Sequence, residues 1–337
     1  MTQTVLITGI SGYIGLHCAA EALRAGYRVR GTVRSPSKQE AVRDAIAAAG
    51  LDTAALDFAV ADLTRDAGWG AAVEGCDFVV HVASPYAIAE PSSEDEMITP
   101  AVEGTLRVLR AARRAGVQRV VLTSSALTMM GTMKTGTFGP EDWTDPEASG
   151  VNTYTRSKTL AEKAAWDFVA EGGEGHGMEL VTLHPGGVFG PPLGENISGQ
   201  SMTMIQQMLR GELPMVPRMA FPMADVRDVA ELHVRAMTHD DVVGRRLVAA
   251  GAEPRGFVRA AEVLNAAGYE GPSTRVAPSL LLRFMGLFDR EARGMSAMLD
   301  THIHADNSVT RDLFDWTPRD FDRTVLDTAE RVSELMG

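Results

Sequence analysis

The sequence lacks a long apolar run. No stretch of about 18 consecutive apolar residues occurs in the 337-residue chain, so we expect no helix that spans a membrane. The N-terminus carries no basic stretch, and the short apolar run after it leads directly into a glycine motif, which argues against a signal peptide. A membrane partner is therefore not expected.

Cysteine and clustered positive charge are also scarce. Cys18 and Cys76 lack the spacing of a disulfide framework or a metal site, and we expect them to be buried thiols in a reducing cytoplasm. The formal net charge is −12 and the basic residues are scattered, so we expect no nucleic-acid partner. His81, His184 and His233 match no metal-ligand spacing, so no metal is predicted.

Segments typical of buried strands alternate with segments typical of helices through roughly the first 185 residues. The expected strands are residues 4–8, 27–33, 56–61, 78–83, 117–123, 180–183 and 246–249. The expected helices are one that ends at Ala25 and those over residues 67–73, 94–115, 153–170 and 202–209. This alternation predicts an α/β fold with a doubly wound parallel sheet of the Rossmann type.

The regular alternation ends near residue 190. We predict that residues 1–190 form a dinucleotide-binding domain and that residues 224–250 return to it. Residues 191–223 and 251–337 are then expected to form a smaller C-terminal substrate-binding lobe, because long segments after the late strands usually carry substrate contacts. From Pro254 onward we expect helices and loops.

Three glycines follow the first expected strand at every third position. Gly9, Gly12 and Gly15 stand between that strand and a helix. In this context glycines permit a tight turn, close approach of a pyrophosphate to the backbone and close packing of helix on strand, while the helix N-terminus faces the anion. The motif predicts a dinucleotide site, with a plain tight turn as the alternative.

The second expected strand ends at a positive charge. No acidic residue lies between Arg28 and Ser37, where chains that bind NAD usually place one for the ribose 2′-hydroxyl. Arg34 stands there instead, with Lys38 four residues later, and such cations suit a 2′-phosphate. We predict a preference for NADP(H); exposed surface cations are the alternative.

Five candidate residues fall at the ends of different expected strands. They are Gly9, Arg34, Asp62, Ala83 and Ser125. Right-handed crossovers bring the carboxyl ends of parallel strands to one edge of the sheet, where open α/β sheets bind their ligands. We therefore expect a single site along this edge.

A tyrosine and a lysine stand four residues apart in an expected helix. Tyr154 and Lys158 would share one helical face, with Cβ atoms about 5–6 Å apart. A free phenol has a pKa of about 10. A positive charge about 4 Å away favours the phenolate by roughly 4 kcal/mol at an effective dielectric constant near 20, which is sufficient for acid–base catalysis near neutral pH. The alternative is a solvated helical pair.

The sequence resembles the extended short-chain dehydrogenases/reductases. The motifs that carry the resemblance are Thr8-Gly9-x-x-Gly12-x-x-Gly15, Thr123-Ser124-Ser125-Ala126 and Tyr154-x-x-x-Lys158. Four further motifs are similar to the branch of dihydroflavonol 4-reductases, cinnamoyl-CoA reductases and aldehyde reductases. They are Gly31-Thr32-Val33-Arg34, His81-Val82-Ala83-Ser84-Pro85, Pro100-Ala101-Val102-Glu103-Gly104-Thr105 and His184-Pro185-Gly186-Gly187-Val188-Phe189-Gly190-Pro191.

This resemblance implies a reductase that uses NADPH to deliver hydride to a carbonyl carbon. Tyr154 would donate the proton, Lys158 would make that phenol more acidic and hold the nicotinamide ribose, and Ser125 would hydrogen-bond the carbonyl oxygen. Ser124 is the alternative serine, and a third possibility is that both serines merely end a strand. The implied cofactor-binding residues are Gly9, Gly12, Tyr13, Ile14, Gly15, Arg34, Lys38, Asp62, Leu63, Val82, Ala83, Ser84, Thr123, Tyr154, Lys158, Pro185, Gly187 and Val188.

The substrate side is expected to be apolar. Tyr86, Met129 and Met130 fall in segments expected to border the pocket, and methionine adapts well to aromatic ligands. These residues favour a small apolar or aromatic aldehyde or ketone, although methionines that only fill the core are the alternative. Met130 also replaces an asparagine that contacts the flavonoid in plant dihydroflavonol reductases, so a dihydroflavonol substrate is not expected.

Two other functions stay open at this point. A sugar-nucleotide epimerase or dehydratase would hold NAD tightly, and a non-catalytic dinucleotide sensor would share the fold. Arg34 argues against the first, and retention of both Tyr154 and Lys158 argues against the second. The expected partner is a small carbonyl or alcohol substrate, and the chain is expected to be a monomer or a homodimer.

Overall fold

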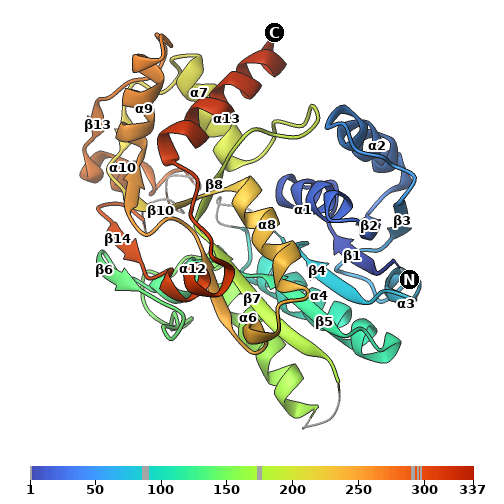
Figure 1. The fold of residues 1–337 in the computed structure, drawn as a ribbon. Helices are drawn as coiled ribbons and strands as arrows, with labels where there is room; N and C mark the ends of the chain where they lie inside the picture. Colours follow the sequence, from blue (N-terminus) through green and yellow to red (C-terminus); the bar gives the residue numbers. More distant parts are fainter. Residues whose placement is uncertain (1, 86–90, 173–176, 290–292, 294–295, 297) are drawn as a thin grey trace.

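The computed structural model describes residues 2–85, 91–172, 177–289, 293, 296 and 298–337 (Figure 1). Its centre is a seven-stranded sheet in which every pairing is parallel. In spatial order the strands are β3 (Leu56–Val60), β2 (Arg28–Val33), β1 (Thr4–Thr8), β4 (Phe78–His81), β5 (Arg119–Thr123), β7 (Glu179–Pro185) and β11 (Arg246–Ala249). The predicted doubly wound parallel sheet is confirmed.

Helices cover both faces of this sheet (Figure 1). Alternate residues of β1 enter different apolar clusters, with Val5 and Ile7 on one face and Leu6 on the other. The first face packs against α1 (Tyr13–Arg24) and α8 (Val226–Ala236), which also contact each other. The second face packs against α4 (Asp95–Ala115) and α6 (Thr153–Glu171). Strand order reverses between β1 and β4, which is where such sheets open a ligand crevice.

A second, smaller sheet lies beside the first. Its path is β12 (Pro254–Gly256), β10 (Ala220–Asp225), β14 (His302–Ala305) and β6 (Thr135–Phe138), and β8 (Gly187–Phe189) also pairs with β10. The strands β9 (Val216–Pro217) and β13 (Val276–Ala277) form a separate pair. The expectation of only helices and loops after Pro254 was wrong, because β12, β13 and β14 are two to four residues long and pair with partners far away in sequence.

The remaining helices are shorter. They are α2 (Gln39–Ala48), α3 (Trp69–Val73), α5 (Leu127–Met130), α7 (Gln200–Leu209), α9 (Phe257–Ala266), α10 (Ser279–Met285), α12 (Ser308–Phe314), α13 (Phe321–Met336) and the 3₁₀ helices Pro36–Lys38 and Asp240–Val242. Helix α13 packs against α7 and α9 at the upper left of Figure 1. These helices and the second sheet enclose their own apolar cluster, which is rich in methionine.

The C-terminal segment is tied to the first 250 residues by polar contacts. Thr328 Oγ1 accepts a hydrogen bond from the Gly190 amide at 2.8 Å, and Thr324 Oγ1 donates to Asp225 Oδ2 at 2.8 Å. The proposed division at residues 190, 224 and 250 stays a prediction, although β11 of that returning segment pairs with β7. Among the described residues, no helix combines the length and the apolarity needed to cross a membrane.

Candidate active site

The glycine turn joins β1 to α1 at the carboxyl edge of the sheet. Gly9 adopts φ +65°, and a Cβ there would lie 3.1 Å from Ala83 Cα. A Cβ on Gly15 would lie 2.4 Å from the Gly9 carbonyl oxygen, so no side chain fits. Helix α1 begins directly after Gly12, with no acidic residue in its first turn. Its N-terminus therefore offers unpaired amides and a positive dipole end to an anion.

Tyr13 and Ile14 open that helix. The Tyr13 hydroxyl donates a 2.7 Å hydrogen bond to the Gly190 carbonyl, which ties the glycine turn to the segment after β8. Burial, reinforced by Asp225, raises the pKa of Tyr13 well above its usual range, so this phenol stays neutral. Ile14 is partly buried against the apolar clusters.

Positive charge is exposed at the end of β2. Arg34 and Lys38 are both solvent-exposed, and neither side chain forms an ion pair or hydrogen bond with a residue that the structure describes. At the end of the neighbouring β3, Asp62 Oδ1 accepts hydrogen bonds from the Thr64 amide at 2.8 Å and its hydroxyl at 2.7 Å. These bonds, helped by Arg34, lower the pKa of Asp62. Leu63 is partly buried and packs against the cluster under α4.

The end of β4 is fixed by a short hydrogen-bond chain. The Ala83 amide donates to Thr8 Oγ1 at 3.0 Å, and the Thr8 hydroxyl lies 2.8 Å from His81 Nδ1. Burial, with Lys158 adding to it, lowers the pKa of His81 to about 3 and keeps it neutral. Val82, Ala83 and Ser84 are partly buried along this edge.

Tyr154 and Lys158 lie one turn apart on α6. The helix begins where Asn152 Oδ1 accepts a hydrogen bond from the Thr155 amide at 2.8 Å. Lys158 is only 7% exposed, and its ammonium donates to the Thr123 carbonyl at 3.2 Å. Burial lowers the pKa of Lys158 to about 8, against the opposing charge of Glu162. Tyr154 is partly exposed, whereas Lys158 is buried.

The two serines after β5 have different surroundings. Ser124 Oγ donates a 2.5 Å hydrogen bond to Glu162 inside the protein. Ser125 Oγ accepts a 3.3 Å bond from the Leu127 amide, and no described residue accepts its hydroxyl proton. The Thr123 hydroxyl lies 2.7 Å from His233 Nε2, so Thr123 offers Lys158 its carbonyl rather than its side chain.

The turn from β7 to β8 lies beside these serines. The Pro185 carbonyl accepts a 2.9 Å hydrogen bond from the Ala126 amide, which joins this turn to the segment that carries Ser125. At Gly187 a Cβ would lie 2.7 Å from both Met223 Sδ and the Phe221 ring, and Val188 pairs with Ala224 of β10. Pro185, Gly187 and Val188 therefore connect the large sheet to the smaller one at the site.

The structure gives little information on the three residues expected to contact the substrate. Tyr86 lies outside the described residues. Met129 and Met130 of α5 are 2% and 6% exposed and belong to the methionine-rich cluster. Their contacts in this structure are those of core residues, and α5 begins two residues after Ser125. A pocket role for the two methionines stays a prediction.

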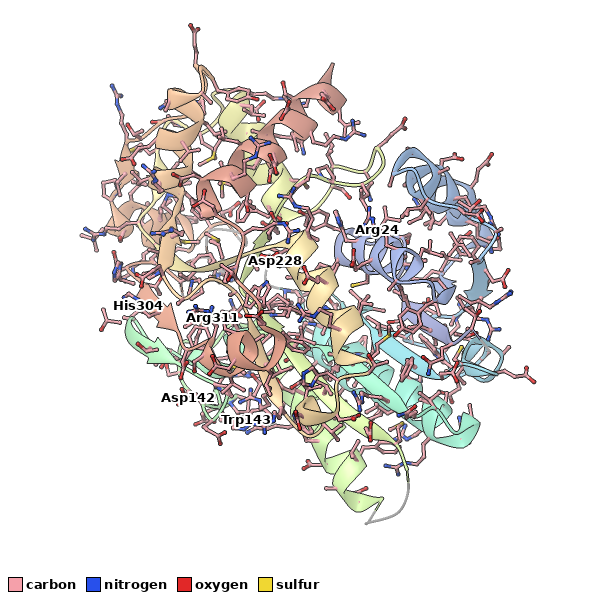
Figure 2. All side chains as sticks on the ribbon, viewed as in Figure 1. Arg24, Asp142, Trp143, Asp228, His304 and Arg311 are labelled. Atoms are coloured by element: carbon pink, nitrogen blue, oxygen red, sulfur yellow. The ribbon has the colours of Figure 1, made fainter. Side chains whose placement is uncertain are left out.

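A buried cluster centred on Glu162 was not predicted from the sequence. The carboxylate of Glu162 accepts hydrogen bonds from Ser124 and Arg246 and lies 2.8 Å from His184 Nε2. Arg246 stacks 3.7 Å from the centre of the Trp143 ring and donates to the Asp142 carbonyl at 2.5 Å; both partners are labelled in Figure 2. The available signal was the position of Glu162 four residues after Lys158, on the same helical face.

Each of the three histidines considered above as metal ligands contacts another group of the protein. His81 contacts the Thr8 hydroxyl. His184 Nδ1 lies 3.3 Å from the Leu247 carbonyl, and His233 Nδ1 lies 2.6 Å from the Val229 carbonyl. Across the described parts of the chain, no group of three or more His, Cys, Asp or Glu residues is arranged to hold a metal ion.

Comparison with known proteins gives matches to one family, to curated relatives and to solved structures. Residues 5–250 match the NAD dependent epimerase/dehydratase family. Dihydroflavonol 4-reductase of Zea mays is 37% identical over 63% of this chain and 59% of its own, and cinnamoyl-CoA reductase 1 of Arabidopsis thaliana is 35% identical over 76% and 73%. The yeast methylglyoxal/isovaleraldehyde reductase Gre2, solved with NADPH, shares the fold with a TM-score of 0.81 at 24% identity, over 99% of both chains.

Proposed function

The chain belongs to the NAD dependent epimerase/dehydratase family, and we propose that within it this protein is an NADPH-dependent reductase of small aldehydes or ketones. The observation that carries the proposal is the buried Lys158 at the carboxyl edge of the sheet, hydrogen-bonded to Thr123 and one turn from Tyr154. Two relatives above 30% identity are named dihydroflavonol 4-reductase and cinnamoyl-CoA reductase 1, which supports a reductase function.

The glycine turn fits a dinucleotide. At Gly9 and Gly15 the neighbouring backbone comes so close that a Cβ would not fit without strain. The N-terminus of α1, which begins after Gly12, suits a pyrophosphate. Exposed Arg34 and Lys38 at the end of β2 suit the 2′-phosphate that distinguishes NADPH. NADPH, when bound, supplies the hydride.

The residues of this chain would then manage the proton and the developing charge. Tyr154 donates its phenolic proton to the carbonyl oxygen as the carbonyl carbon is reduced. Lys158 stabilises the phenolate left behind, because its ammonium is held one helical turn away in a region shielded from water. Ser125, whose hydroxyl proton is not taken by a described residue, hydrogen-bonds the same carbonyl oxygen.

The proposed substrate is an apolar or aromatic carbonyl compound. The methionine-rich cluster includes Ala126, directly after Ser125, and continues through α7 and β10, so apolar, adaptable side chains adjoin the proposed substrate side of the site. Met130 stands where plant dihydroflavonol reductases carry an asparagine, which argues against a dihydroflavonol.

A panel of aldehydes and ketones, followed by NADPH absorbance, tests this function. The proposal expects NADPH oxidation with at least one apolar or aromatic carbonyl compound. Tightly bound NAD without net oxidation would instead support a sugar-nucleotide epimerase or dehydratase. NADPH binding without turnover of any substrate in the panel would support a dinucleotide sensor.

Arg34→Ala is expected to weaken the preference for NADPH. Removing the guanidinium leaves the 2′-phosphate with Lys38 alone, so kcat/KM with NADPH falls about tenfold or more while kcat/KM with NADH changes little, since one charge-assisted contact contributes roughly 1.5–3 kcal/mol. Arg65→Ala, which removes another cation near Asp62, is the control. An unchanged NADPH/NADH ratio in Arg34→Ala would contradict the assignment.

A further inference from the structure

Glu162 occupies the third position of a single helical stripe. Tyr154, Lys158 and Glu162 follow one another at intervals of four residues along α6, so they lie on one face of the helix. The Glu162 side chain is 1% exposed, and a carboxylate is rarely buried to this degree without several partners. Its partners outside α6 include Ser124, which directly follows β5, Thr128 of α5, His184 of β7 and Arg246 of β11.

Both oxygens of this carboxylate are occupied. Oε2 accepts from the Ser124 hydroxyl at 2.5 Å and lies 2.8 Å from Thr128 Oγ1. Oε1 accepts from Arg246 Nε at 2.7 Å and lies 2.8 Å from His184 Nε2. Burial raises the pKa of Glu162, but His184 and Arg246 outweigh it and hold the pKa well below its usual range. The carboxylate is therefore ionised at neutral pH.

These contacts reach the backbone of the proposed catalytic serine. Ser124 directly precedes Ser125, and Thr128 Oγ1 also lies 2.9 Å from the Ser125 carbonyl oxygen. The Thr123 carbonyl, one residue before Ser124, receives the Lys158 ammonium. Glu162 and Lys158 therefore hydrogen-bond to neighbouring residues of one short segment, Glu162 to Ser124 and Lys158 to Thr123.

The charge of Glu162 also bears on Lys158. The other titratable groups near this ammonium are Tyr154 on α6 and His81 at the end of β4, and His81 is neutral. The buried residues of α4, the helix packed on α6, are all uncharged: Met97, Ala101, Gly104, Thr105, Val108, Leu109, Ala111 and Ala112. His184 and Arg246 contact the Glu162 carboxylate from β7 and β11. Glu162 is therefore the described negative charge nearest to Lys158 along its helix.

We propose that Glu162 is a positioning residue for carbonyl reduction, which holds the Ser124–Ser125 segment in place and keeps Lys158 positively charged during turnover. The inference rests on the proposed reductase function. Lys158 must stay protonated to stabilise the Tyr154 phenolate. Burial lowers the pKa of Lys158 to about 8 against the opposing charge of Glu162, so loss of that charge would lower the pKa of the amine further.

The test is the pH profile of kcat/KM in Glu162→Gln. Removing the negative charge lowers the pKa of Lys158, so the alkaline limb of the profile moves to lower pH by at least about one unit, a tenfold change in proton affinity. Glu179→Gln is the matched control, because Glu179 also pairs with a buried arginine, Arg119, but at the opposite end of β5 and β7. It should lower the melting temperature without moving the alkaline limb.

A second measurement does not depend on activity. The chain has four lysines, so protein labelled with ¹³C at lysine Cε gives four signals, and Lys158 is assigned by replacing Lys38, Lys134 and Lys163 with arginine. In Glu162→Gln the Lys158 signal should titrate at least about one pH unit lower than in the wild type. A Lys158 titration equal to that of the wild type would overturn the proposal.

Two further outcomes need to be told apart: a wild type without reductase activity, and a Glu162→Gln variant that does not fold. If the wild type reduces no carbonyl compound, the reductase function fails, while the lysine titration still decides the electrostatic part of the inference. If Glu162→Gln does not fold, the double variant E162L/R246L removes both charges of the buried pair and takes its place in both measurements. Unshifted profiles and titrations in that variant overturn the proposal as well.

Discussion

Tyr154→Phe lowers kcat for carbonyl reduction by roughly a thousandfold, within the range of about 10²–10⁴ that a positioned general acid contributes. The substitution removes only the phenolic oxygen, so the ring, α6 and the Lys158–Thr123 hydrogen bond stay in place. NADPH affinity, measured by fluorescence titration, should fall by about tenfold at most, since a hydrogen bond to an uncharged group contributes roughly 0.5–1.5 kcal/mol and each 1.4 kcal/mol is about tenfold in affinity.

Tyr27→Phe is the matched control for this experiment. The Tyr27 ring packs edge-on against Phe78, with ring centres 6.2 Å apart, far from the carboxyl edge of the sheet. Removing its hydroxyl should leave kcat unchanged. Wild-type kcat in Tyr154→Phe would show that the proton comes from another group and would end the proposed mechanism.

Arg246→Leu is expected to destabilise the fold by about 3–5 kcal/mol at pH 7, the usual cost of removing one partner from a buried ion pair. Arg246 is 9% exposed and Glu162 is 1% exposed, so water cannot replace the lost guanidinium. Urea unfolding measures the effect. Arg24→Leu is the control, because Arg24, labelled in Figure 2, pairs with Glu21 at the surface and should cost less than about 1 kcal/mol.

The pH dependence of this loss has a definite sign. In the wild type the pKa of Glu162 lies below its unfolded value of about 4.3, so its ionised form stabilises the fold above that pH and ceases to do so as the pH falls. In Arg246→Leu, burial is no longer offset to the same extent, and the pKa of Glu162 rises. The difference in stability between the two proteins should therefore be largest above the raised pKa of Glu162 in the variant and shrink as the pH falls below it, toward the depressed pKa of the wild type. A difference that grows on acidification would contradict this account.

The central sheet was predictable because its signals are local. Strand β1 has the predicted bounds, since a continuous run of β-branched and apolar residues is bounded by a glycine turn. The second sheet was not predictable in this way. β6 and β14 have four residues each and become strands only by pairing with a partner 167 residues away in sequence, which no local pattern reports.

The residues of the site likewise fall into those that the sequence could predict and those that it could not. Motifs that follow strands of the central sheet, such as Gly9 and Ser125, were assignable to one edge from topology alone, and the family resemblance they carried is confirmed. Arg246 lies at the start of a four-residue strand and meets Glu162 only after the chain has folded, so nothing near it in sequence marks it. The catalytic and cofactor roles given to individual residues stay predictions until the variants above are measured.

Thr324 and Thr328 of the last helix hydrogen-bond with Asp225 and Gly190. These bonds limit where the chain can be truncated. A truncated gene product ending at residue 250, where the family match stops, would leave the Asp225 carboxylate and the Gly190 amide without these partners and would expose the apolar face on which α13 packs. The last helix is thus part of the folding unit that carries the glycine turn. Domain exchange with related reductases should therefore keep the last helix together with the glycine turn.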